Sequence, residues 1–89
     1  MTTELEELVL EELISDITRD LMIYNDDYNT FDHVINTLVK VCKHTAEQAE
    51  QCAWIIHTKG KYCVKKGAYE TLKPMRDAIC EAGIDAKIH

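Results

Sequence analysis

Residues 24–34, YNDDYNTFDHV, lie between a short apolar run and a long amphipathic pattern, and they mark where a strand gives way to a helix. The preceding residues 21–24, LMIY, form the centre of a strand-like segment that starts near Ile17. Asn and Asp, which come next, are among the commonest residues in turns. The stretch therefore predicts a strand, a turn and a helix start in immediate succession.

A helix is predicted over residues 30–43, directly after this turn. Apolar side chains recur there at the three- and four-residue intervals of one helix face, namely Phe31, Val34, Ile35, Leu38, Val39 and Cys42. Either Asn29 or Thr30 can serve as the N-cap, because both side chains can accept a hydrogen bond from a free backbone N–H group.

A second helix is predicted over residues 45–59. Thr45 and Gln48 form the pattern of a capping box at its start, and Gly60 is a typical C-terminal stop. The inner face is expected to carry Ala49, Cys52, Ala53 and Ile56. His57 follows Ala53 by one turn, so we expect it on that same buried face.

The rest of the chain predicts a strand, a helix and a strand. Residues 61–65 alternate as a strand that ends at Gly67, a helix follows over residues 69–82, and residues 84–88 alternate as a last strand. Pro74 is expected to fit only near the first turn of its helix. The order predicts an α+β sandwich, with three helices packed on one face of a three-stranded, mainly antiparallel sheet.

The acidic charge is concentrated at the start of the chain. The 89 residues have a net charge of −6, and 46% of them are hydrophobic, which suits one domain with a real core. Residues 1–20 contain seven acids and one base, so the rest of the chain is neutral. We therefore predict an acidic N-terminal extension over residues 1–16 and a core domain over residues 17–89.

The composition argues against several classes of protein. There is no basic stripe, so we expect no nucleic-acid partner. No apolar run approaches the ~20 residues of a membrane span, and no secretory signal pattern is present, so we expect a cytoplasmic protein without a membrane partner. The four cysteines form no CxxC pair and are expected to be buried free thiols.

The acidic cluster at residues 25–27 raises the question of which cation it serves, and calcium fits poorly. An EF-hand loop counted from Asn25 needs Gly at its sixth position and Glu at its twelfth. This chain has Thr30 and Asn36 at those positions.

A transition metal or a hydrolytic reaction fits no better. Asp26, Asp27, Asp32, His33 and His57 are acceptable ligand types, but Asp32 and His33 diverge by roughly 100° on a helix. Asp26 and Asp27 are expected to point to opposite sides of an extended segment. No nucleophile motif accompanies them. We expect no metal, no cofactor and no enzymatic activity, and a simple turn remains an alternative for part of the cluster.

Two separate motifs resemble the ClpS adaptor family. The first is the Asn-Asp-Asp-Tyr run at residues 25–28, and the second is the His-x-x-Gly-Lys run at residues 57–61. The resemblance covers residues 21–89 and implies the same order of strands and helices. It also implies an adaptor, not an enzyme, that binds proteins beginning with Leu, Phe, Tyr or Trp. Such an adaptor delivers these proteins to a ClpA-like or ClpC-like AAA+ unfoldase of a Clp protease, and we expect it to be a monomer.

The resemblance further implies a site for the first residue of a substrate. Its α-amino group would be held by Asn25, Asp26 and His57. An α-ammonium has three N–H donors, so an amide oxygen, a carboxylate and a neutral imidazole nitrogen complement it. The pocket for the first side chain is implied at Asn29, Phe31, Val34, Ala53 and Ile56.

Two positions depart from the family pattern, and one alternative fold family shares the topology. Phe31 stands where well-known members carry Met, and Ala53 is smaller than the side chain often found there, so the ranking of first residues stays open. The alternative is a structural protein-interaction domain that resembles the C-terminal domain of a bacterial ribosomal stalk protein. That class does not recognise N-terminal residues and lacks both motifs.

Overall fold

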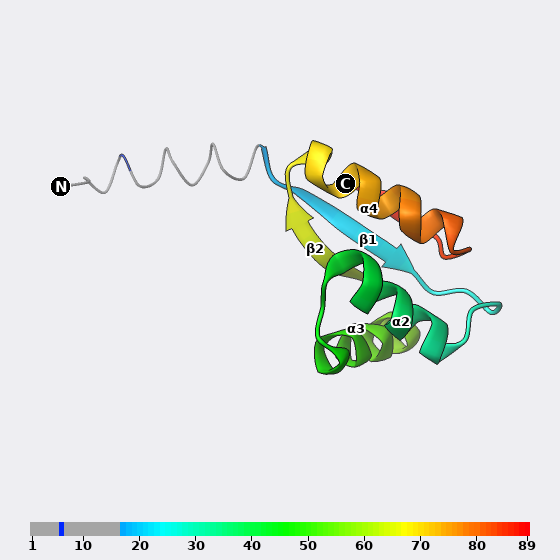
Figure 1. Ribbon diagram of the computed structural model, residues 1–89. Coiled ribbons are helices and arrows are strands. Elements are labelled where there is room, and N and C mark those ends of the chain that lie inside the picture. Colours follow the sequence, from blue (N-terminus) through cyan, green and yellow to red (C-terminus); the bar gives the residue numbers. More distant parts are fainter. Residues whose placement is uncertain (1–5, 7–16) are drawn as a thin grey trace.

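The computed structural model describes residue 6 and residues 17–89 of the chain (Figure 1). Its elements follow the order β1 (Arg19–Tyr24), α2 (Phe31–Cys42), α3 (Ala46–Lys59), β2 (Lys61–Gly67), α4 (Tyr69–Glu81) and β3 (Ala86–Ile88). This order confirms the predicted α+β fold. The predicted extension over residues 1–16 lies outside the described residues, apart from residue 6.

The strand β1 is the centre of an antiparallel sheet with the order β2-β1-β3. Tyr24, at the end of β1, pairs with Lys61, at the start of β2. At the residue that follows Tyr24, the backbone N–H of Asn25 donates to the carbonyl of Gly60 at 2.8 Å. These bonds hold the turn that follows β1 beside the C-terminal end of α3, although the two are far apart in the sequence.

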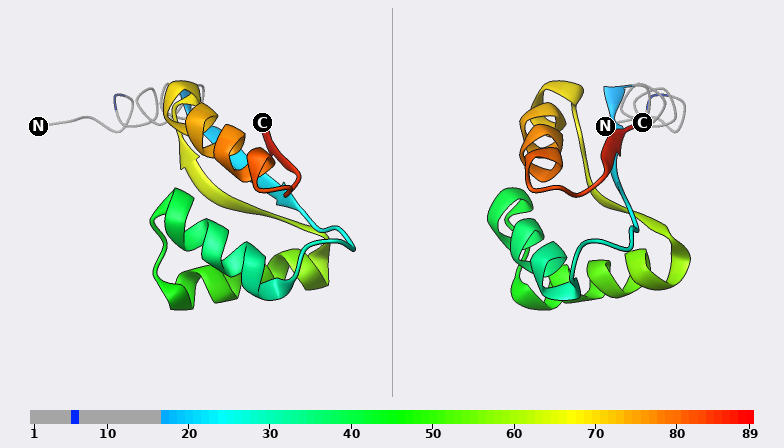
Figure 2. Two further views of the ribbon diagram at one scale, coloured as in Figure 1. Left: turned by 45° about the vertical axis from the view of Figure 1, so that its right-hand side comes forward. Right: turned by 90° about the vertical axis from the view of Figure 1, so that its right-hand side faces the viewer.

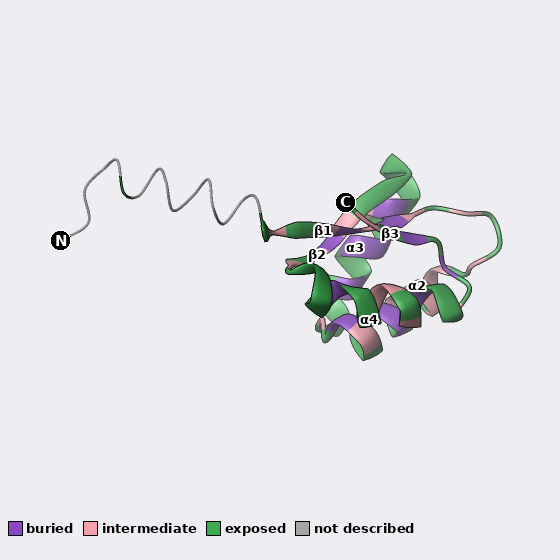
Figure 3. Cartoon of the chain, turned by 90° about the horizontal axis from the view of Figure 1, so that it is seen from above, coloured by how far each residue is buried: buried purple, intermediate pink, exposed green. Residues whose placement is uncertain are grey.

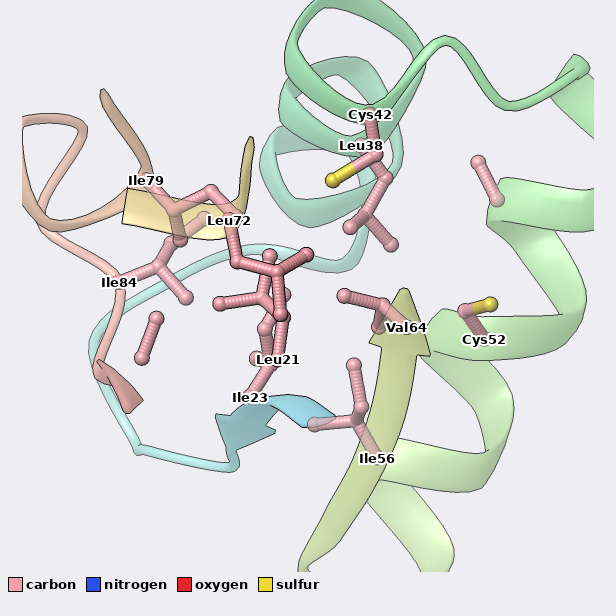
Figure 4. Packing of buried hydrophobic residues seen from close by; sticks show 12 residues of the cluster. Leu21, Ile23, Leu38, Cys42, Cys52, Ile56, Val64, Leu72, Ile79 and Ile84 are labelled. Atoms are coloured by element: carbon pink, nitrogen blue, oxygen red, sulfur yellow. The ribbon is translucent and has the colours of Figure 1, made fainter. Parts of the chain in front are cut away.

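The core lies between the sheet and the helices. Leu21 and Ile23 have no exposed surface, and the two-residue period of a strand puts both on one side of the sheet. In Figure 4 they lie among side chains from all three helices and from β2, including Leu38, Ile56, Val64, Leu72 and Ile79. The helices therefore cover one face of the sheet, as predicted (Figure 2), and the buried residues lie where these two layers meet (Figure 3).

The helix ends agree with the capping patterns of the sequence. Thr30 is the N-cap of α2, and its side chain accepts from the backbone N–H of His33 at 3.1 Å. Both hydrogen bonds of the capping box form between Thr45 and Gln48 at the start of α3. Gly60 ends α3 with φ +88°, a left-handed conformation that glycine adopts without a steric penalty.

Three details differ from the predictions. The strand β3 is shorter than predicted, because Ile84 is buried in the loop after α4 and strand pairing begins at Ala86. The helix α4 continues through Pro74, which lies in its second turn. Only Cys42 and Cys52 are buried, whereas Cys63 is half-buried and Cys80 is exposed. All four thiols are free.

Candidate binding site

A cavity of about 460 Å³ lies between the start of α2, the second half of α3 and the loop that follows β1. All eight residues that the sequence nominated line this cavity, namely Asn25, Asp26, Asn29, Phe31, Val34, Ala53, Ile56 and His57. The lining also includes three residues that were not nominated, namely Asp27, Thr30 and Trp54. The fold thus brings the two sequence motifs to one hollow.

The carboxylate of Asp26 is held in place by three hydrogen bonds. Its Oδ1 accepts from the backbone N–H groups of Tyr28, at 2.9 Å, and Asn29, at 2.8 Å. Its Oδ2 accepts from the side-chain amide of Asn29 at 2.6 Å. The backbone hydrogen bond from Asn29 contributes most to lowering the pKa of this carboxyl, while partial burial opposes the shift. Asp26 is therefore a fixed negative charge at neutral pH.

Asn29 connects Asp26 to a distant part of the chain. Its side-chain nitrogen also donates to the carbonyl of Gly83, at 2.9 Å, in the loop after α4. Gly83 has φ +88°, which favours glycine at this position. The two N–H groups of the Asn29 side-chain amide thus bond to Asp26 and to Gly83. Asn29 therefore orients Asp26, and it also lines the cavity.

His57 is exposed, and the expectation that it is buried was wrong. Ala53 and Ile56, its neighbours on α3, are each 3% exposed. His57 lines the cavity next to Ile56, and its imidazole is accessible although Ala53, one turn earlier, is buried. The ring of Trp54 lies edge-on to the ring of His57, with centroids 6.4 Å apart.

The side chains of Asp26 and Asp27 were expected to point to opposite sides of an extended segment. This expectation was wrong, because the chain bends at residues 27–29. Asp26 and Asp27 consequently line the same cavity. The bend follows from the hydrogen bonds of Asp26 to the two residues beyond Asp27, which is the geometry that Asp commonly adopts in turns.

The apolar part of the lining comes from both helices. Ala53 and Ile56 of α3 are buried, and Phe31 and Val34 of α2 are half-buried. A smaller cavity adjoins the first and shares five of its lining residues, namely Asn25, Asp26, Asn29, Val34 and Ile56. Ile84 from the loop after α4 also lines it. The sequence pattern did not indicate Ile84, because the loop after α4 meets this cavity only in the folded chain.

The other histidines make backbone or side-chain contacts away from the cavity. The Nε2 atom of His33 lies 2.8 Å from the carbonyl of Ala82, and that of His44 lies 2.8 Å from the carbonyl of Val64. Within the described part of the chain, no three histidine, cysteine or carboxylate side chains are grouped so that they could hold a metal ion. Among residues 17–89, no helix combines the length and apolar character that a membrane crossing requires.

Comparison with known proteins shows a family match over most of the chain. The family model of the ATP-dependent Clp protease adaptor protein ClpS matches residues 18–86. The ClpS adapter protein of Nitratidesulfovibrio vulgaris strain Miyazaki F is 33% identical over 55 residues, which are 56% of this chain and 55% of that protein. The chain thus spans about half the length of this curated relative.

Two further proteins are similar to the chain. The E3 ubiquitin-protein ligase UBR1 of Drosophila melanogaster is 34% identical over 58 residues, which are 65% of this chain but only 3% of that protein. The solved structure of Agrobacterium tumefaciens ClpS2 bound to L-phenylalaninamide aligns with a TM-score of 0.70 at 20% identity. That alignment covers 81% of this chain and 94% of the other, and at this identity it shows a shared fold.

Proposed function

The chain belongs to the ClpS family of ATP-dependent Clp protease adaptor proteins, and we propose that it is an adaptor for proteins that begin with a bulky hydrophobic residue. In this proposal the site binds a free N-terminal Leu, Phe, Tyr or Trp. The adaptor then delivers the bound protein to the AAA+ unfoldase of a Clp protease. It catalyses no reaction itself.

The observation that supports this proposal most strongly is the fixed carboxylate of Asp26, which lines the same cavity as several apolar side chains. A protonated chain terminus is a small cation with three N–H donors and no acceptor. Asp26 offers it a charged acceptor whose orientation is set in advance by Asn29 and Tyr28. Asn25 and His57, which line the same cavity, supply the remaining acceptors. Preorganised acceptors reduce the ordering cost of binding.

The apolar lining explains why a bulky first residue is required. Burying a Leu or Phe side chain contributes about 1.5–3 kcal/mol, which a small or polar first residue does not supply. The cavity is lined on this side by Phe31, Val34, Ala53 and Ile56. The ligand of the similar Agrobacterium tumefaciens structure, L-phenylalaninamide, combines the same two chemical groups, a free α-amine and an aromatic side chain.

The test is a panel of fluorescent peptides that differ only in the first residue. We expect Phe, Tyr, Trp and Leu peptides to bind and Ser or Glu peptides not to bind. Acetylation of the α-amine should abolish binding, because it removes both the charge and two of the donors. Equal affinity for free and acetylated peptides would overturn the proposal.

Two variants make this test specific to the carboxylate. Asp26→Ala should weaken binding by about tenfold or more, the value of a hydrogen bond to a charged group. Asp32→Asn is the matched control, because Asp32 is exposed in the first turn of α2 and does not line the cavity. Delivery is tested separately, by degradation of a reporter protein that begins with Phe, with and without the adaptor, by a purified ClpA- or ClpC-type protease.

A further inference from the structure

Trp54 lines the cavity, although neither of the two motifs in the sequence includes it. It is the only tryptophan of the chain, and 54% of its surface is exposed. Tryptophan is usually largely buried, because its side chain has a large apolar surface. A half-exposed indole at the wall of a hollow therefore has surface left for an occupant to cover.

The neighbours of Trp54 define the shape of this wall. Its ring packs edge-to-face against the ring of Phe31, with centroids 5.3 Å apart and an angle of 66°. Phe31 is the first residue of α2, so the pair links α2 to α3 at one side of the cavity. Ala53, adjacent to Trp54, is buried and short, which leaves room between the helices for a large side chain.

We propose that Trp54 is a specificity-determining residue, which makes the site prefer an aromatic first residue over Leu. This inference rests on the proposed function and deepens it. An aromatic side chain in the cavity meets two aromatic rings, and aromatic pairs are stabilised beyond the burial of their area. A Leu side chain gains only the free energy of burying its own apolar surface. The substrates that bind best are therefore proteins beginning with Phe, Tyr or Trp.

The test compares two peptides, identical except for a first residue of Phe or Leu, by fluorescence anisotropy. In the native protein the Phe peptide should bind more tightly. In Trp54→Leu the ratio of the two affinities should fall roughly two- to tenfold, the contribution of an aromatic pair. Trp54→Phe should keep most of the preference, because it keeps a ring at the wall. A ratio that stays unchanged in Trp54→Leu would overturn the inference.

A control variant shows whether the change in the affinity ratio is specific to the wall of the cavity. Tyr69→Leu removes an exposed aromatic residue outside the cavity, and it should leave the ratio unchanged. An equal loss for both peptides in Trp54→Leu would show that Trp54 only supports the helices, and it would overturn the inference.

Trp54 is the only tryptophan of the chain, so the tryptophan fluorescence of the native protein reports on this residue alone. Titration with the Phe peptide should change its emission, and unchanged emission on binding would contradict contact with the occupant. If neither peptide binds the native protein, or if acetylated peptides bind equally well, the proposed function itself fails. That result is distinct from binding without a change in the ratio.

Discussion

Asn29 holds both oxygens of the Asp26 carboxylate, since its backbone N–H donates to Oδ1 at 2.8 Å and its side-chain amide donates to Oδ2 at 2.6 Å. The second donor of the same amide reaches the carbonyl of Gly83 at 2.9 Å. The orientation of the charged acceptor is therefore set by the loop after α4 as well as by its own turn. This relationship predicts an effect of Asn29 on binding.

Asn29→Ala should weaken the binding of a Phe peptide roughly tenfold, because one hydrogen bond to a charged group is lost. The variant should also raise the pKa of Asp26 toward its usual range, which an NMR titration of the carboxyl would detect. Asn36→Ala is the matched control, because Asn36 is exposed on α2 and lies outside the cavity. A normal affinity in Asn29→Ala would show that the two backbone bonds suffice.

The lowered pKa of Asp26 predicts a pH dependence of stability. Hydrogen bonds from Asn29 favour the ionised form in the folded state, so the pKa lies below the ordinary value of 3.8. Asp26 therefore stabilises the fold at pH values above 3.8, and this contribution is lost as the pH falls through the lower, folded value. The difference in unfolding free energy between the native protein and Asp26→Asn should be present at pH 7 and shrink at pH 2, as measured by urea denaturation.

His57→Ala should weaken the binding of a Phe peptide, because His57 lines the cavity and its ring nitrogen can accept a hydrogen bond from the α-ammonium of the ligand. His57→Gln keeps an acceptor oxygen at this position and should keep most of the affinity. Fluorescence anisotropy measures both affinities. An unchanged affinity in His57→Ala would exclude His57 as an acceptor.

The four thiols should react at different rates with a maleimide or a disulfide reagent. Cys80 is exposed and should react first. Cys42 should react last, because it is buried and burial raises its pKa to about 11. Mass spectrometry of peptides after short labelling times measures the order. Early modification of Cys42 would show that α2 opens readily from the core.

The capping box of α3 should contribute measurably to stability. Thr45→Ala removes the side chain that accepts from the backbone N–H of Gln48, which costs about 1 kcal/mol in typical helices. For a domain of this size the melting temperature should fall by about 4–8 °C. Thr58→Ala is the comparison for a side-chain hydrogen bond outside the capping box, because the exposed Thr58 donates its hydroxyl to the carbonyl of Trp54 at 2.8 Å near the end of the same helix.

The periodic parts of the sequence predicted the fold well. The apolar run of β1, the helical spacing in α2 and the capping box of α3 all reflect interactions within a few residues, which a local pattern can record. The family resemblance brought Asn25, Asp26 and His57 together, and the structure places them at one cavity. Their roles in binding remain predictions.

The missed features depend on contacts between distant segments. Nothing in the sequence near Asn29 indicates its bond to Gly83, which crosses from the turn after β1 to the loop after α4. The exposure of His57 depends on a hollow formed by two helices and a loop, which helical spacing alone does not describe. Trp54 could have been noticed, since it lies three residues before His57 and is thus a neighbour on the helix surface.

The pairing of Tyr24 with Lys61 means that the cavity is complete only after these two strands have paired. A ribosome that has released the chain only as far as α2 has produced Asp26 but not yet His57, so only one wall of the cavity exists. In the proposed function, a chain at this stage of synthesis cannot yet bind a substrate.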